Sequence, residues 1–141
     1  MKPIGYWLNR TDRALTDHMN GMLEEFGLTR LAWQVLNVIQ DTPEVTDVEV
    51  LSILAANADA PALTTAIDTV LSADWATRPA PDRLALTSEG THHLARVAER
   101  VEAFRKLSTT GISMDEYHTA VSVLERMTRN LETAMVTDPT P

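Results

Sequence analysis

The 141-residue chain contains no cysteine, which excludes disulfide bonds, thiol catalysis and thiolate-based redox sensing. Long apolar runs are missing as well: a stretch such as residues 50–58 is far shorter than the roughly 20 residues that cross a bilayer. The N-terminus also lacks the basic, apolar and small-residue series of a signal peptide. We therefore expect a cytoplasmic protein with no membrane partner.

The sequence features of an enzyme are missing too. The chain has no glycine-rich phosphate loop, and no serine or carboxylate cluster has an activating partner at a recognisable spacing. We expect neither catalytic activity nor a bound cofactor.

Basic residues are absent from the middle of the chain. No lysine, arginine or histidine occurs between Leu31 and Thr77, and the whole chain carries a formal net charge of −8. Proteins that bind phosphate backbones normally present a basic face, so this distribution disfavours tight binding to nucleic acid. The same stretch holds seven acidic residues, namely Asp41, Glu44, Asp47, Glu49, Asp59, Asp68 and Asp74.

The composition that remains is typical of a globular domain, and the spacing of its apolar residues indicates helices. Apolar residues make up 44% of the chain and charged residues 23%, as in ordinary globular proteins. Apolar side chains recur at helical spacing over residues 4–26, and Gly27 ends that segment. Thr29 is a suitable N-cap for a second helix, which we expect to continue until Pro43.

Two shorter helices are expected next. Thr46-Asp47-Val48-Glu49 matches a capping box and predicts a third helix over about residues 47–57. Residues 57–61 supply a turn, an N-cap and a proline for the first turn of a fourth helix, at about residues 61–73. Its apolar side chains form one stripe that we expect to be buried. The polar side chains left outside are Thr64, Thr65, Asp68 and Ser72.

The pattern changes after Trp75. Prolines at positions 79 and 81 exclude a helix, and the alternation over residues 83–86 predicts a short strand within a small hairpin at most. Residues 87–90 begin another amphipathic helix, which extends to about residue 107, and Ser113 caps the last helix. The predicted fold class is therefore mainly α with a small β wing.

Several short motifs occur in a recognisable order along this framework. They are IGYWLNR at residues 4–10, Gly27-Leu28-Thr29 followed by Trp33, then Trp75, Arg78, Asp82-Arg83 and LALTSEG at 84–90. Together they resemble the MarR family of winged helix-turn-helix transcriptional regulators. Each motif alone is weak, and their order and spacing carry the resemblance, which covers residues 4–133.

The resemblance implies a single domain over residues 1–141. Within it, a winged helix-turn-helix occupies residues 28–88, and dimerisation helices occupy residues 1–27 and 89–136. It also implies a homodimer, a recognition helix at about residues 61–73, and a regulator that binds double-stranded DNA and responds to an effector. The chain departs from the family pattern on the DNA-facing side, because the turn before the recognition helix is longer and the wing is shorter and poorer in arginine.

The candidate DNA contacts are few. No residue on the fourth helix can make the bidentate arginine-to-guanine contact, and its one carboxylate would have to accept from cytosine. Asp82-Arg83 fits either an ion pair that orders the wing tip or a probe of the minor groove. We therefore expect weak or strongly salt-sensitive binding. The candidate residues are Thr64, Thr65, Asp68, Arg78 and Arg83.

Aromatic side chains near the dimerisation helices suggest a pocket for a small aromatic or amphipathic effector. Such pockets combine aromatic walls with a few polar groups. Packing in the core or dimer interface is the alternative, and it is the role we expect for each of these residues. The candidate pocket residues are Tyr6, Trp7, Met22 and Trp33.

The histidines raise a zinc-sensing alternative. No two of them have the three- or four-residue spacing that places two ligands on one helix face. We expect surface or capping histidines and no metal site. The four residues are His18, His92, His93 and His118.

The missing arginines leave a second hypothesis for function. A winged-helix dimer that has lost operator binding could use its acidic face to engage a basic protein, or could simply bind a small ligand. Saturable binding to duplex DNA at low salt separates the regulator from this module.

Overall fold

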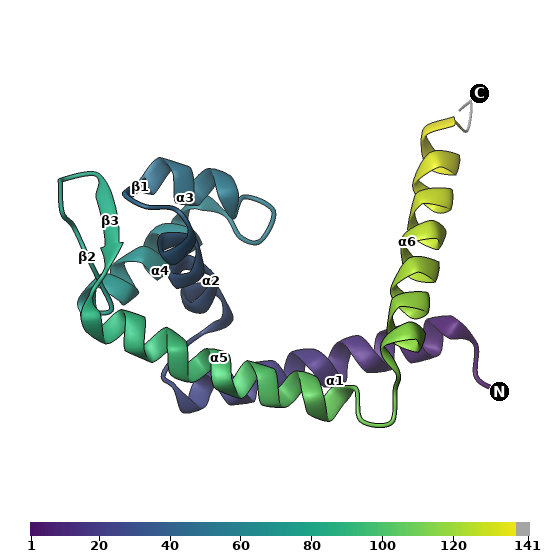
Figure 1. Cartoon of the computed structure of the whole chain (residues 1–141). Coiled ribbons are helices and arrows are strands. Elements are labelled where there is room, and N and C mark those ends of the chain that lie inside the picture. Colours follow the sequence, from purple (N-terminus) through teal and green to yellow (C-terminus); the bar gives the residue numbers. More distant parts are fainter. Residues whose placement is uncertain (138–141) are drawn as a thin grey trace. The chain divides into compact units, whose positions relative to one another are not determined.

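The computed structural model describes residues 1–137 and divides the chain into two compact units, Met1–Val101 and Glu102–Pro141, which we describe separately. The expected domain boundaries remain a prediction. The elements are the helices α1 (Ile4–Glu25), α2 (Arg30–Asp41), α3 (Asp47–Ile53), α4 (Ala60–Ser72), α5 (Ser88–Ser108) and α6 (Met114–Thr137), and the strands β1 (Val45–Thr46), β2 (Ala76–Thr77) and β3 (Arg83–Leu86) (Figure 1).

Side-chain caps fix where the helices begin, as the sequence predicts. The Oγ1 atom of Thr29 accepts the amide of Ala32 at 3.1 Å, and a carboxylate oxygen of Asp59 accepts the amide of Ala62 at 2.9 Å. Thr46 and Glu49 form both hydrogen bonds of a capping box. These contacts satisfy amides that a helix start leaves unpaired. After α1, Gly27 adopts a φ of +69°, a conformation that glycine reaches without strain.

The core of the first unit lies where α2, α4 and β3 meet (Figure 1). The predicted stripe of α4 is confirmed at Leu63, Ile67 and Val70, whereas Leu71 is half-buried. Each fully buried aliphatic side chain contributes about 1.5–3 kcal/mol relative to exposure, so this packing fixes the opposite face of α4 toward solvent. The largest fully buried residues are Leu23, Val35, Leu36, Val45, Val50, Leu63, Ile67, Val70, Leu84 and Val97.

The wing is a three-stranded antiparallel sheet with the order β1-β3-β2. Val45 pairs with Leu84, and Ala76 pairs with Leu86. The β2–β3 hairpin is as predicted, but the expectation of a hairpin at most is wrong, because β1 adds a third strand. A strand of two residues has no alternation that a sequence pattern could reveal. Burial of Val45 in the core holds it in place.

Helix α3 is shorter than predicted, ending at Ile53 instead of near residue 57. The carbonyl of Leu54 accepts the amides of Asn57 and Ala58 at 2.9 and 3.3 Å, which closes a turn. Leu54 is buried, so the chain leaves the helix while anchored in the core. The turn then presents Asp59 in the extended conformation that an N-cap needs.

The second unit comprises the end of α5, a turn and α6. Gly111 adopts a φ of +76° in the turn. Ser113 caps α6 as predicted, and its amide donates to Glu116 in return. The backbone hydrogen bond from Ser113 also lowers the pKa of Glu116. Large apolar side chains remain exposed in this unit, namely Leu107, Ile112, Met114, Tyr117, Val121, Leu131, Met135 and Val136.

Across residues 1–137, no helix combines the length and apolar character needed to cross a bilayer.

Candidate nucleic-acid interface

Helix α4 presents a polar face on the side away from the core. The outward residues that the sequence predicts, Thr64, Thr65, Asp68 and Ser72, are all exposed, and so is Thr69. At about 100° per residue, these five positions fall within roughly 140° of the helix circumference, opposite the buried stripe. The structure thus places the predicted DNA-contacting residues of α4 on one exposed strip.

The hydroxyl groups on this strip are partly committed to the helix itself. Thr65 donates from Oγ1 to the carbonyl of Pro61 at 3.0 Å, and Thr69 donates to the carbonyl of Thr65 at 2.9 Å. Each hydroxyl has one proton to donate. These two residues therefore offer a methyl group and acceptor lone pairs to a ligand, and they offer no donor unless the internal bond breaks.

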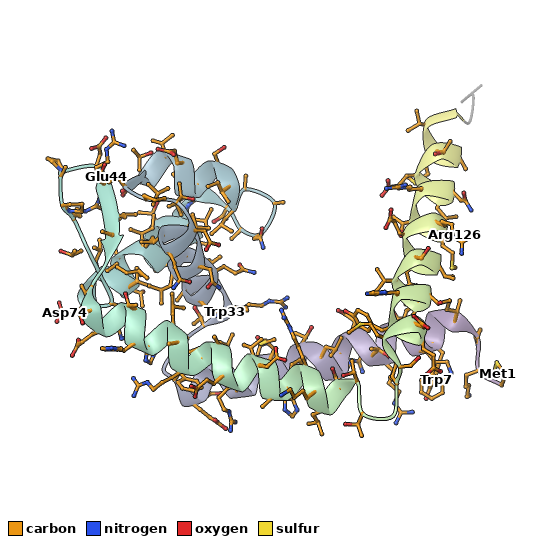
Figure 2. All side chains as sticks on the ribbon, in the orientation of Figure 1. Met1, Trp7, Trp33, Glu44, Asp74 and Arg126 are labelled. Atoms are coloured by element: carbon orange, nitrogen blue, oxygen red, sulfur yellow. The ribbon has the colours of Figure 1, made fainter. Side chains whose placement is uncertain are left out.

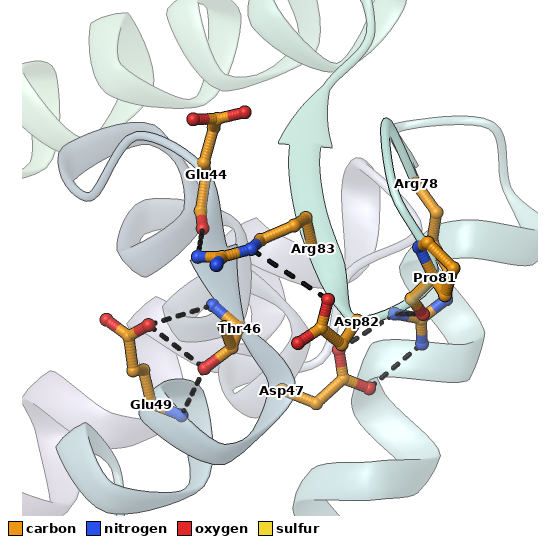
Figure 3. A network of polar contacts seen from close by, with 8 residues as sticks. All are labelled: Glu44, Thr46, Asp47, Glu49, Arg78, Pro81, Asp82 and Arg83. Atoms are coloured by element: carbon orange, nitrogen blue, oxygen red, sulfur yellow. Dashed lines mark hydrogen bonds and ion pairs between the residues drawn. The ribbon is translucent and has the colours of Figure 1, made fainter.

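The first wing arginine is bound to the helix-turn-helix. Arg78 donates to both carboxylate oxygens of Asp47, at 2.8 and 2.9 Å, and also approaches the carbonyl of Pro81 at 3.4 Å (Figure 3). The hydrogen bond to Asp47 raises the pKa of Arg78, and the charges of Asp68 and Asp82 act in the same direction. Arg78 therefore lies in the field of three carboxylates, which offset its attraction for phosphate.

The second wing arginine is bound as well. Arg83 donates to the backbone carbonyl of Glu44 at 3.1 Å, and its Nε atom lies 3.8 Å from the carboxylate of Asp82 (Figure 3). Glu44 itself has a φ of +53°, which is unusual for a residue with a side chain. The ion pair at residues 82–83 is thus present but long. The shorter contact of Arg83 is the one to the carbonyl of Glu44, which lies 39 positions earlier in the chain, and sequence spacing does not reveal it.

A junction between the wing and α5 centres on Trp75 and His93. Their rings stack at 4.5 Å between centroids with an angle of 13°. The Nε2 atom of His93 donates to the carbonyl of Phe26 at 2.9 Å, and Arg96 donates to Nδ1 at 3.2 Å. Because the carbonyl can only accept and the guanidinium can only donate, the imidazole of His93 is the neutral tautomer with its proton on Nε2. The prediction of a surface or capping role is therefore wrong for His93, whose exposed fraction is 8%.

The junction leaves little free space for the backbone. The carbonyl of Trp75 accepts the amide of Thr87 at 3.0 Å, and Thr87 donates to the carbonyl of Asp74 at 2.6 Å. A Cβ added at Gly90 would overlap the carbonyl oxygen of Trp75. A hollow of about 710 Å³ lies beside this junction. It is lined by Trp75, Glu89, His92, His93, Ala95, Arg96 and Glu99.

The four residues predicted to line an effector pocket do not lie around one common hollow. Tyr6 and Trp7 form an exposed edge-to-face pair at the start of α1, at 5.0 Å between ring centroids. Met22 is buried near the other end of that helix, roughly 22 Å away at 1.5 Å per residue. Trp33 is half-buried on α2, well apart from Trp7 (Figure 2). Trp75 and His93, which line the hollow, were not among the predicted pocket residues.

Within residues 1–137, no group of three or more histidine, aspartate or glutamate side chains is placed to hold a metal ion. The zinc-sensing alternative thus gains no support from the described part of the chain.

Comparison with known proteins identifies the fold. No family model and no curated protein matches the sequence. Reduced MarR from E. coli matches with a TM-score of 0.71 and 23% identity, over 90% of this chain and 94% of the other. Rv2887, a MarR family protein of Mycobacterium tuberculosis in complex with DNA, matches at 0.72 and 21%, over 90% and 98%. MepR, a transcription regulator of the Staphylococcus aureus multidrug efflux pump MepA, matches at 0.77 and 13%, over 92% and 99%.

The class of structure is therefore a winged helix-turn-helix with long terminal helices, mainly α with a small wing. Its structural neighbours are MarR-family regulators, and the chain shares their fold.

Proposed function

We propose that this chain is a homodimeric transcriptional regulator that binds duplex DNA with α4 in the major groove and the wing against the backbone. The observation that carries the proposal is the exposed polar strip of α4, held outward by a buried stripe on the opposite face. A helix of this diameter fits the major groove of B-DNA. The match to a MarR family protein in complex with DNA supports DNA as the ligand of this fold.

Electrostatics sets the strength that we expect of this binding. Phosphate contacts normally supply much of the affinity of a DNA-binding protein. Here the helix-turn-helix contains seven acidic residues and no lysine or arginine between residues 31 and 77, and both wing arginines already have partners. Binding is therefore weak at moderate salt and rises as salt is lowered, with a slope set by the few phosphate contacts that the wing arginines can make.

Exposed apolar side chains support the homodimer. The first turns of α1 leave Ile4, Trp7 and Leu8 exposed, and α6 separately leaves Met114 and Leu131 exposed. A monomer that kept so many large apolar residues in water would be an aggregation hazard, whereas a second copy would cover them. The molar mass by light scattering tests this: a dimer is expected, and a monomer at all concentrations would contradict it.

An effector would act through the junction of Trp75 and His93. The hollow beside these rings combines an aromatic wall with the guanidinium of Arg96 and the carboxylates of Glu89 and Glu99, a mixed lining that suits a small amphipathic aromatic ligand. The backbone carbonyl of Trp75 accepts the amide of Thr87 at the end of the wing, so a ligand that shifted the backbone at Trp75 would also shift the wing. An effector must bind one wing position more tightly than the other to change DNA affinity.

A second candidate function follows from the engagement of both wing arginines. If Arg78 and Arg83 stay bound to Asp47 and Glu44, the exposed face of the unit is acidic and suits a basic protein. This module would show no saturable binding to DNA even at low salt.

A gel-shift titration of a random duplex pool at about 50 mM salt separates the two functions. The regulator predicts a saturable shift, and an absence of any shift would leave the acidic module as the better account.

A further inference from the structure

We infer that α4 selects its operator through methyl groups and acceptors, so that Asp68 specifies a cytosine and the threonines specify neighbouring thymines, with no guanine contact from this helix. This inference rests on the proposed function and names the base sequence that the same site would take.

The first step concerns which donors α4 has. Its sequence, APALTTAIDTVLS, contains no arginine, lysine, histidine, asparagine or glutamine. The protons of Thr65 and Thr69 are used in bonds to the carbonyls one turn back. Thr64 and Ser72 keep rotatable hydroxyls, which either donate or accept and so discriminate weakly between bases. The helix thus has no strong donor for the O6 and N7 acceptors of guanine.

The second step concerns Asp68. Its carboxylate is exposed in the middle of the strip, between Thr64 and Ser72 along the helix. An ionised carboxylate only accepts hydrogen bonds. Cytosine presents an N4 amino group in the major groove with no acceptor beside it, whereas adenine places N7 next to its amino group. Guanine and thymine present acceptors that repel the carboxylate. Cytosine is therefore the base that Asp68 favours.

The third step concerns the methyl groups. Because their hydroxyl protons bond backward, Thr65 and Thr69 have only their methyl groups and acceptor lone pairs left to contact a base. Threonine methyl groups pack against the C5 methyl of thymine. The expected DNA half-site is therefore a cytosine with thymines beside it, at the base pairs whose major-groove edges α4 contacts.

The test is selection of bound duplexes from a random pool at about 50 mM salt, using the full chain, followed by affinity measurements on single sites. The variant Asp68→Asn exchanges an acceptor for an amide that pairs with the N6 and N7 atoms of adenine. The control, Asp41→Asn, removes the same charge at the end of α2 and leaves α4 unchanged. Both variants lose one negative charge and so gain the same non-specific attraction for DNA, but only Asp68→Asn should lose the cytosine contact and change a base preference.

For the wild-type chain, we expect one cytosine column in each half-site, and exchange of that cytosine for guanine should weaken binding by roughly tenfold or more. In Asp68→Asn the column should become adenine, and in Asp41→Asn it should stay cytosine. Replacement of the flanking thymines by deoxyuridine, which lacks the methyl group, should weaken binding several-fold. It should have a smaller effect on Thr65→Ser, which lacks one of the protein methyl groups.

Two results would overturn the inference, and they are distinguishable. Saturable binding with the same base preference in wild type and Asp68→Asn would refute the reading by Asp68 and leave the regulator intact. A lack of binding to any duplex at low salt would remove the proposed function together with the inference.

Discussion

Arg78 and Asp47 form a two-point ion pair, with nitrogen to oxygen distances of 2.8 and 2.9 Å, that joins the wing to the first turn of α3. The pair turns a residue expected to contact phosphate into one that neutralises an acidic neighbour (Figure 3). DNA binding by Arg78 must therefore compete with this contact, and the competition can be measured.

Asp47→Asn should raise the affinity for duplex DNA, because it removes a negative charge and releases Arg78 for a phosphate. Asp41→Asn removes an equal charge without releasing an arginine, so it serves as the matched control. Fluorescence anisotropy across a salt series should show a slope steeper by about one for Asp47→Asn, the change expected for one added phosphate contact. Equal slopes in the two variants would show that Arg78 makes no contact with DNA when it is released.

The same pair predicts a dependence of stability on pH. The hydrogen bond from Arg78 holds the pKa of Asp47 below the ordinary value of 3.8. The pKa of Asp47 is therefore lower in the folded state than in the unfolded state. The ion pair stabilises the fold fully at a pH above the unfolded-state pKa, and this stabilisation is lost as the pH falls through the folded-state pKa. Because 32% of the Arg78 side chain and 36% of the Asp47 side chain are exposed to solvent, which screens the pair, the loss is under about 1 kcal/mol. In urea titrations, wild type and Asp47→Asn should differ at neutral pH and converge in strong acid; a constant difference would contradict this origin.

Arg83→Ala should weaken binding to all duplexes alike. The guanidinium of Arg83 lies at the wing, where it can reach a phosphate if it leaves the carbonyl of Glu44. A phosphate contact carries no base information, so its loss lowers affinity uniformly and reduces the salt slope by about one. Unchanged affinity and slope in the anisotropy assay would remove the wing arginine from the mechanism.

Gly90→Ala should destabilise the fold strongly. The added Cβ would overlap the carbonyl of Trp75, and the atoms that it meets are all backbone atoms of that residue, which cannot rotate away as a side chain can. Overpacking of this kind costs about 1–3 kcal/mol. Gly21→Ala is the control, since a Cβ there meets nothing within 4 Å and alanine favours the interior of a helix by about 0.5–1 kcal/mol. Thermal melts should therefore shift in opposite directions, and an unchanged melting temperature for Gly90→Ala would contradict the close contact.

The sequence was sufficient for features that depend on neighbouring residues. The caps at Thr29, Thr46 and Asp59, the stop at Gly27 and the outward strip of α4 all follow from local patterns, and the structure confirms them. The MarR-like fold was predicted from the order of short motifs, and the structural neighbours confirm it.

Features that depend on distant partners could not be predicted in this way. His93 looks like a surface residue until the carbonyl of Phe26, 67 positions earlier, is placed beside its ring. Arg78 and Asp47 lie 31 positions apart, and no periodic pattern links them. Strand β1 is held by burial of Val45 in a core that forms only when the chain has folded. The site therefore required three-dimensional placement of its partners, whereas the framework did not.

The central claim is that an acidic winged helix reads duplex DNA, and the most direct test is anisotropy of a labelled duplex enriched from the random pool. We predict saturable binding at about 50 mM salt that exceeds binding to a scrambled duplex, with loss of most of the affinity at about 200 mM. Equal binding to both duplexes, or no saturation at the lower salt, would contradict the claim.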